Sequence, residues 1–260
     1  MQRDKFSEDT VKEDQNMIFG IRAVMEAVDA GKEIERIFMQ RDINNPLARD
    51  LKKMLTDHNI PYSPVPVEKL NRLTRKNHQG VVCFIGFVAY QKTEDVVPSL
   101  FEKSAYPLVL ILDRITDVRN FGAICRSAEC MGVDAVIVPE KGGAMVNGDA
   151  VKASAGALNR IKICREHNLK NTITYLKESG FLIAGCTEKG TKNCFDENFD
   201  RPVCLILGSE EDGISPEYLK RCDVLIKIPI SGKIASLNVS VAAGMLLYEI
   251  SRQRLQNEKR

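Results

Sequence analysis

The 260-residue chain has no tryptophan, only three histidines and few aromatic residues. No apolar run approaches the roughly 18 residues needed to span a bilayer, and the polar, acidic start MQRDKFSEDTVKEDQ is unlike a signal or transit peptide. None of the eight cysteines has CxxC spacing to another, and the chain is too long for a disulfide-stapled miniprotein. We therefore expect buried free thiols, no metal and no membrane partner, in a cytoplasmic protein.

Two glycine signatures of nucleotide-binding enzymes are also missing. The first apolar strand of the longer half is followed by LDRITDVRNFG rather than GxGxxG, and no GxxxxGK[ST] occurs anywhere in the chain. These absences disfavour a nicotinamide oxidoreductase and a P-loop enzyme. The oxidoreductase is kept as an alternative that a test of NAD binding would exclude.

The charges leave the choice of partner open. The net charge is +2, with 44% hydrophobic and 28% charged residues, which is typical of a globular chain. Residues 17–90 are the most basic part, and yet they are not basic enough for charge alone to predict a nucleic-acid partner.

Hydrophobic patterns divide the chain into four parts. Residues 1–16 lack periodicity and are predicted to be a flexible tail. Residues 17–90 alternate helical patterns with strand-like patterns and predict a small α/β domain, with helices at 18–31, 45–59 and 67–75 and strands at 36–40, 62–66 and 80–90. Residues 91–105 contain a proline and mixed charges, and we interpret them as a linker.

Residues 106–260 predict a second α/β domain. Short apolar strands at 108–113, 134–139, 160–164, 181–187, 204–209 and 224–230 alternate with helices at 120–132, 168–180, 215–222 and 237–254. This alternation is what a mostly parallel sheet covered on both faces requires. In such sheets ligands bind beyond the carboxyl ends of the strands, so the loops that follow the strands are the candidate site.

Three of these loops are polar. The first carries Asn120 and Gly122 and leads to Arg126, and the second carries three consecutive acids from Glu210. The third, from Ser231 to Ser240, contains a glycine and several side chains that can accept or donate hydrogen bonds. Each polar residue alone is more often a helix cap or a local backbone contact, but three such loops at strand ends predict a binding site.

Together these residues resemble the three motifs of the SpoU (TrmH-type) 2′-O-ribose RNA methyltransferases of the SPOUT superfamily. Asn120-Phe121-Gly122 with Arg126 is similar to the first motif, LILGSEEDGI (205–214) to the second, and IPISGKIASLNVSVAAGMLLYE (228–249) to the third. Residues 152–157 resemble a stretch between the first two motifs, and the nearest subgroup is the RlmB-type 23S rRNA guanosine methyltransferases. One departure is Glu211-Asp212, where family members often carry glycine.

The resemblance implies a fold and a cofactor. Residues 17–90, which end in His78-Gln79-Gly80, resemble an L30e-like domain that binds the RNA substrate. Residues 106–260 would form a SPOUT domain with a C-terminal trefoil knot that holds S-adenosylmethionine. The implied cofactor-binding residues are Thr187, Leu207, Gly208, Ile228 and Leu237.

The resemblance also implies a reaction and two partners. The reaction is methyl transfer to a ribose 2′-hydroxyl, with catalytic roles for Asn120, Arg126, Glu210, Ser236 and Asn238. Arg126 is assigned to the chemistry without fixing its proton role, because a guanidinium rarely deprotonates. The partners are RNA, most simply rRNA, and a second copy of the chain in a homodimer.

A basic cluster in the small domain is the predicted RNA contact, with a solvated helix face as the alternative. It comprises Lys69, Arg72, Arg75, Lys76 and His78. Lys69, Arg72 and Lys76 are predicted to share one helical face, and the alternative for His78 is a position beside a turn. The alternatives for the whole chain are a tRNA 2′-O-methyltransferase and a catalytically inactive, ribosome-associated RNA-binding protein. The sequence does not identify the nucleotide that is modified.

Overall fold

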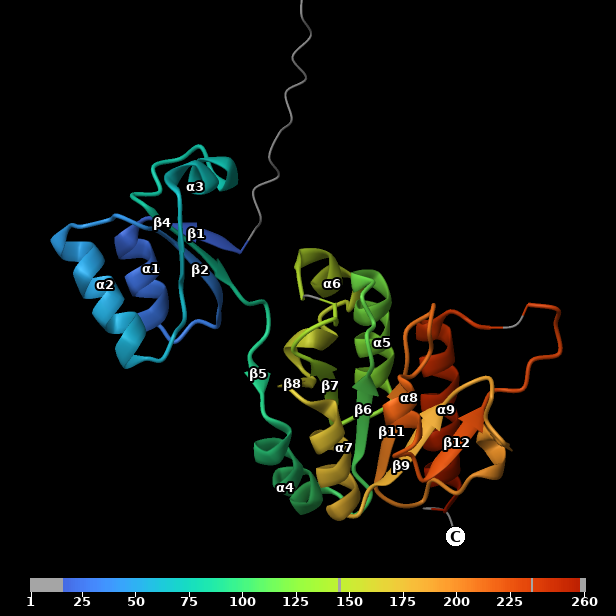
Figure 1. The fold of residues 1–260 in the computed structure, drawn as a ribbon. Helices are drawn as coiled ribbons and strands as arrows, with labels where there is room; N and C mark the ends of the chain where they lie inside the picture. Colours follow the sequence, from blue (N-terminus) through green and yellow to red (C-terminus); the bar gives the residue numbers. More distant parts are fainter. Residues whose placement is uncertain (1–15, 145, 235, 258–260) are drawn as a thin grey trace, which may run out of the picture. The chain divides into compact units, whose positions relative to one another are not determined.

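The computed structural model describes residues 16–144, 146–234 and 236–257. The predicted tail 1–16 lies outside these residues except for Asn16, whose side-chain amide donates to the carbonyl oxygen of Ile85 at 2.8 Å. The chain divides into two compact units, with the boundary between Phe87 and Val88 (Figure 1). None of the helices within the described ranges is long and apolar enough to cross a membrane.

Unit 1 contains a four-stranded sheet in the order β1-β4-β2-β3. β4 pairs antiparallel with β1 and β2, and β3 pairs parallel with β2. The strands are β1 (Met17–Phe19), β2 (Ile34–Gln40), β3 (Ser63–Val65) and β4 (Val81–Ile85), and the helices are α1 (Ile21–Asp29), α2 (Pro46–Asp57) and α3 (Val67–Leu73). The α/β prediction for this part is confirmed, although β1 occupies residues that were expected to begin a helix.

The two faces of this sheet have separate cores. Alternation along β2 places Ile37 and Met39 on the face covered by α1 and α2, where they are fully buried with Leu51. Phe38 points to the other face and packs with Leu70 of α3. The unit is therefore a sheet with helices on both sides.

Unit 2 is built on an eight-stranded sheet in the order β10-β12-β9-β11-β6-β7-β8-β5, in which every neighbouring pair is parallel. Its strands are β5 (Tyr90–Gln91), β6 (Leu108–Leu112), β7 (Ala135–Pro139), β8 (Lys162–Glu166), β9 (Leu182–Cys186), β10 (Lys192–Asn193), β11 (Val203–Leu207) and β12 (Val224–Lys227). The predicted parallel α/β sheet is confirmed.

Helices form layers on both faces of the sheet. α4 (Thr93–Lys103), α7 (Leu169–Glu178) and α8 (Pro216–Leu219) pack on the face that carries Val109 and Ile111. α5 (Val118–Cys130) packs against α6 (Gly148–Ala153) and α9 (Val239–Asn257) in the second layer (Figure 1). Two 3₁₀ turns, η1 (Ala157–Asn159) and η2 (Cys194–Asp196), complete the unit.

The segment 91–105, which we interpreted as a linker, is instead part of unit 2. β5 pairs with β8, and α4 buries Val96, Val97 and Leu100 in the core of the unit. The backbone N–H and the hydroxyl of Thr93 both donate to Glu166, at 2.7 and 2.8 Å. Pro98 inside α4 obscured a helical spacing of apolar residues in the sequence. The predicted strand 80–90 is likewise divided between the sheets of the two units.

The strand order of unit 2 determines where its loops meet. β9 lies between β12 and β11, and β11 lies between β9 and β6. Because all these strands are parallel, their carboxyl ends share one edge of the sheet. The loops after β6, β9, β11 and β12 therefore converge, although they come from four distant parts of the sequence.

Candidate active site

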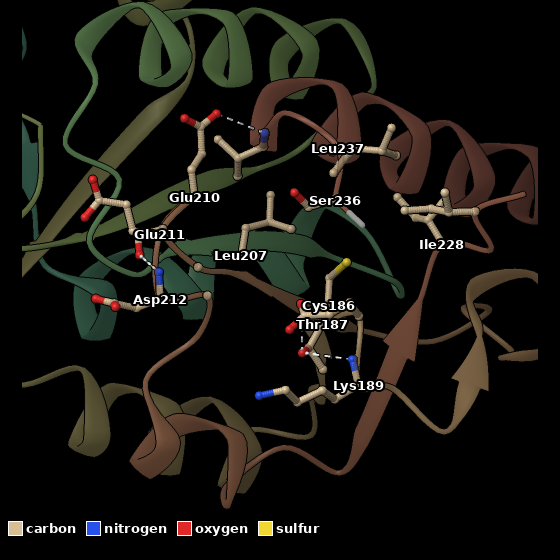
Figure 2. Close-up of a pocket in the computed structure, with 17 residues that line it drawn as sticks. Cys186, Thr187, Lys189, Leu207, Glu210, Glu211, Asp212, Ile228, Ser236 and Leu237 are labelled. Carbon is tan, nitrogen blue, oxygen red and sulfur yellow. Dashed lines mark hydrogen bonds between the residues drawn. The ribbon is translucent and has the colours of Figure 1, made fainter. Parts of the chain in front are cut away.

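The converging loops enclose a cavity of about 380 Å³ (Figure 2). Its lining comes from the ends of β9, β11 and β12 and from the start of α9, and comprises Cys186–Lys189, Leu207–Gly213, Ile228, Ile230, Ser236, Leu237, Val239 and Ala242. All five residues predicted to bind a cofactor are in this lining. Two of the predicted catalytic residues, Glu210 and Ser236, are there as well.

A tight turn after β9 forms one wall of the cavity. The backbone N–H of Thr187 donates to the carbonyl oxygen of Ile226 of β12 at 2.9 Å. The N–H of Gly190 donates to the carbonyl oxygen of Thr187, also at 2.9 Å. A Cβ atom at Gly190 would lie 2.6 Å from the carbonyl carbon of Ile226, so only glycine allows this approach. The turn holds Glu188 and Lys189 at the cavity.

The loop 208–213 forms a second wall. Ser209 and Gly213 exchange two backbone hydrogen bonds, at 3.0 and 3.2 Å, and Gly213 has a φ of +68°. A Cβ atom at Gly208 would lie only 2.0 Å from the carbonyl carbon of Gly213. The loop closes on itself through these two glycines and carries Glu210, Glu211 and Asp212 at its tip.

Three predicted catalytic residues meet beside this loop. Glu210 Oε1 accepts hydrogen bonds from Nδ2 of Asn120 at 3.0 Å and from Nδ2 of Asn238 at 2.7 Å. Asn238 also donates to Oδ1 of Asn120 at 3.0 Å. Its own Oδ1 accepts from the N–H of Ser240 at 2.9 Å near the start of α9, which fixes the orientation of the amide. The carboxylate thus joins the loops that follow β6, β11 and β12.

Arg126 is not brought to the cavity. It lies on α5 about 9 Å along the helix axis from Asn120, is exposed, and makes no hydrogen bond or ion pair with the described residues. Asn120 and Arg126 therefore share a helix, but only Asn120 lines a cavity of a single chain. Gly122 instead allows close packing, since a Cβ atom there would lie 2.6 Å from Ala153 of α6.

A second cavity of about 480 Å³ adjoins the first. The residues Ser209–Asp212 and Val239 line both cavities, so the loop 208–213 is the wall between them. The other lining residues follow β6 or precede β8 and are Arg114, Ile115, Thr116, Asp117, Asn120 and Gly142. Arg114 and Lys189 are charged lining residues that the sequence reasoning missed, and only their places directly after strands could have indicated them.

Arg114 is surrounded by acidic and carbonyl oxygens. Burial acts to lower its pKa, but hydrogen bonds to Asp113 and Asp212 and the charges of both carboxylates outweigh it and raise the pKa above its ordinary value. The guanidinium is therefore a permanent cation at the wall between the cavities.

In unit 1 the predicted RNA-binding residues are divided by their exposure. Lys69, Arg72, Arg75 and Lys76 are exposed, and the Lys69 ammonium lies 4.3 Å from the centre of the Phe38 ring. α3 ends at Leu73, so Lys76 does not share its helical face as the sequence predicted.

His78 is buried in unit 1 and has both ring nitrogens engaged. Nδ1 accepts from the N–H of Gly80 at 3.0 Å, and Nε2 lies 2.9 Å from Oδ1 of Asn71. It therefore holds the turn before β4. This is the turn-adjacent position that the sequence left open for His78, and an RNA contact of this side chain stays a prediction.

The cysteines are all free thiols. Burial raises the pKa of Cys186, at the first cavity, to about 12. No group of three or more histidine, cysteine or acidic residues suited to a metal occurs in the described parts of the chain.

Comparison with known proteins identifies the family. The model of the "SpoU rRNA Methylase family" matches residues 107–248, and a model described as "RNA 2'-O ribose methyltransferase substrate binding" matches residues 17–91. A TrmH family tRNA/rRNA methyltransferase of Staphylococcus haemolyticus is 35% identical over 92% of this chain and 96% of its own length.

Two solved structures share this architecture. The SpoU methyltransferase AviRb from Streptomyces viridochromogenes, in complex with AdoMet, is 25% identical, covers 92% of this chain and 90% of its own, and has a TM-score of 0.59. The TrmH/SpoU tRNA modifying enzyme of A. aeolicus is 30% identical, covers 64% of this chain and 85% of its own, and has a TM-score of 0.55. The loops that build the cavity lie within the matched region, and the chain belongs to the SpoU rRNA methylase family of RNA methyltransferases.

Proposed function

We propose that this protein transfers a methyl group from S-adenosylmethionine to a ribose 2′-hydroxyl of RNA. The observation that carries the proposal is the cavity built by the loops after β9, β11 and β12, with Asn120, Glu210 and Asn238 hydrogen-bonded at its edge. The test is transfer of a labelled methyl group to unmodified rRNA and tRNA, followed by mapping of alkali-resistant linkages. Methylation only of bases would contradict it.

The lining of the first cavity fits S-adenosylmethionine. Its volume of about 380 Å³ is within the range of small-molecule sites, and apolar side chains of Leu207, Ile228 and Leu237 offer a surface for an adenine ring. Glu188 and Glu211 suit the positive ammonium and sulfonium groups, and Lys189 suits the carboxylate. When bound, the cofactor supplies an electrophilic methyl carbon. The AdoMet complex of AviRb supports this assignment.

The chain itself must orient the acceptor and stabilise negative charge. We assign Asn120, Glu210 and Asn238 to holding the ribose, because their polar atoms form one network beside the wall shared by both cavities. Ser236 lines the cavity with a hydroxyl that makes no hydrogen bond to described residues. We assign Arg126 to stabilising the forming alkoxide, which a guanidinium does without losing its proton.

The position of Arg126 supports a homodimer with a shared site. α9 exposes Val241, Met245 and Tyr248, which are 51%, 48% and 60% accessible and recur at helical spacing. Burying this stripe against a second copy would remove apolar surface from water and allow Arg126 of one chain to complete the cavity of the other.

Mixing two inactive variants tests the shared site. Arg126→Ala and Glu210→Ala chains should each be inactive as homodimers, whereas mixed dimers contain one site with both residues and should regain up to half the wild-type activity per mixed dimer. A Met245→Glu change should yield monomers in sedimentation. Failure of the mixture to regain activity, or an active monomer, would contradict the shared site.

We propose that unit 1 binds the RNA substrate, as the match of residues 17–91 to a substrate-binding model supports. The contacts we assign are the exposed Lys69, Arg72, Arg75 and Lys76, and His78 is left out. Replacing Lys69, Arg72 and Lys76 by alanine should make the RNA-binding constant less sensitive to salt. The magnitude of the slope of its logarithm against the logarithm of the salt concentration should fall by about 2 to 3, since each phosphate contact contributes about 0.7 to 0.9. The same change at Arg49, Lys52 and Lys53 of α2 is the control.

The finer identity of the substrate and fold is also proposed. We favour a guanosine of 23S rRNA, with tRNA as the alternative that the assay distinguishes, and an L30e-like fold for unit 1. A trefoil knot in unit 2 is supported by the strand order around β9 and β11, and by Gln253 of α9 donating to the carbonyl oxygen of Glu197 at 3.0 Å. Pulling unit 2 from both ends should give an extended length shorter than that of an unknotted chain.

A further inference from the structure

Arg114 joins two strand-end loops of unit 2. It follows Asp113, which is 1% exposed and extends β6 by donating its N–H to Leu207 of β11 at 2.8 Å. Arg114 has a φ of +57°, a left-handed conformation that is unfavourable for a residue with a Cβ atom. Such strain persists only where surrounding contacts hold it, and it occurs most often at functional sites.

The contacts of the guanidinium all lie on the two loops. Nε donates to Oδ1 of Asp113 at 3.2 Å, Nη1 to Oδ2 of Asp212 at 3.0 Å, and Nη2 to the carbonyl oxygen of Gly213 at 3.2 Å. The other oxygen of Asp113, Oδ2, accepts from the N–H of Ser215 at 2.6 Å. Arg114 and Asp113 thus hold the loop 208–213 at its tip and just beyond its end.

The opposite side of the same loop is held by the two asparagines. Glu210 accepts from Asn120 and Asn238, whereas Asp212 accepts from Arg114. The loop lines both cavities, so its position sets the width of each.

We propose that Arg114 is a positioning residue that, through Asp212 and Gly213, fixes the wall between the two cavities and so sets the affinity for the methyl donor. This inference rests on the proposed function for the identity of the donor. It needs no change in protonation and no further cofactor. Loss of the guanidinium should let the loop 208–213 open, whereas loss of Asp212 alone leaves the bond to Gly213.

The test uses the full chain and five variants, Arg114→Ala, Asp212→Ala, the double variant, Asp212→Glu and Arg119→Ala. Arg119 is the matched control, because it is exposed on α5, lines neither cavity, and its side chain makes no hydrogen bond or ion pair with the described residues. Hydrogen exchange of the 208–215 backbone is measured without ligand, and the Kd for S-adenosylmethionine is measured by calorimetry.

We expect Arg114→Ala to speed hydrogen exchange in 208–215 and to raise the Kd for S-adenosylmethionine about tenfold. Asp212→Ala should raise the same Kd about threefold. These magnitudes are typical of hydrogen bonds that involve charged but partly exposed groups. The double variant should resemble Arg114→Ala, because Asp212 acts through the arginine. Arg119→Ala should change neither measurement, and Asp212→Glu, which keeps the carboxylate, should restore most of the affinity.

Two results would overturn the inference. One is unchanged hydrogen exchange and unchanged donor affinity in Arg114→Ala. The other is a double variant whose fold-change in Kd equals the product of the fold-changes of the two single variants. If the wild-type chain binds no S-adenosylmethionine, the proposed function fails, and exchange in 208–215 still decides whether Arg114 holds the loop.

Discussion

Replacing Gly208 by alanine should open the loop between the two cavities. The added Cβ atom would lie 2.0 Å from the carbonyl carbon of Gly213 and 2.1 Å from the nitrogen of Ile214, both of which are backbone atoms. Restoring ordinary contact requires a backbone shift of roughly 1.4 Å, which no side-chain rotation can supply. Because Ser209–Asp212 line both cavities, the shift changes the shape of each.

The cost can be divided into two opposing parts. Overpacking of this kind costs about 1–3 kcal/mol, and the stiffer unfolded chain of the alanine variant returns about 0.4–1 kcal/mol. The net loss is up to about 2.6 kcal/mol, which for a domain of this size lowers the Tm by up to about 10 °C. The Kd for S-adenosylmethionine should also rise, because the displaced loop lines the cavity, and a tenfold rise corresponds to about 1.4 kcal/mol of lost binding free energy.

Circular dichroism melting and calorimetric binding of S-adenosylmethionine measure the two effects. Gly244→Ala is the control, because its Cβ atom would lie 3.9 Å from Ser127 Oγ in ordinary contact. That change should raise the Tm, since alanine is favoured over glycine within a helix by about 1 kcal/mol. A Gly208→Ala protein with wild-type Tm and wild-type donor affinity would refute the reasoning.

Three further predictions concern single side chains. Arg126→Ala should abolish methyl transfer while leaving donor affinity within a few-fold, and transfer near the wild-type rate would remove that arginine from the chemistry. Glu210→Gln keeps an oxygen that can accept hydrogen bonds from Asn120 and Asn238 but loses the negative charge. Methyl transfer should therefore fall with little change in Tm. Equal Tm losses in Glu210→Gln and Glu210→Ala would count against this role for the charge. Burial raises the pKa of both Cys83 and Cys186 from 9.0 to about 12. Unfolded thiols therefore lose protons first, and the free energy of unfolding should fall as pH rises from 9 towards 12, a decline that chemical denaturation at each pH measures.

Local patterns were sufficient for much of the fold. Alternating short apolar strands and amphipathic helices predicted the α/β class and the parallel sheet of unit 2, because strand and helix periodicity is a property of neighbouring residues. They failed at 91–105, where Pro98 hid a helix, and they did not indicate the burial of His78, which depends on Asn71 and the turn to Gly80. Neither contact has a local signature.

The sequence by itself determined the family motifs, the strands and which loops follow them, and these were enough to predict that Thr187, Gly208 and Leu237 would share a site. Only the tertiary structure decided how those loops meet. Arg114 reaches Asp212 across the paired ends of β6 and β11, and Arg126 is exposed and lines neither cavity of its own chain. The physical reason is that strand order and helix direction set distances between residues far apart in sequence, whereas residue type and spacing report only what each segment does locally.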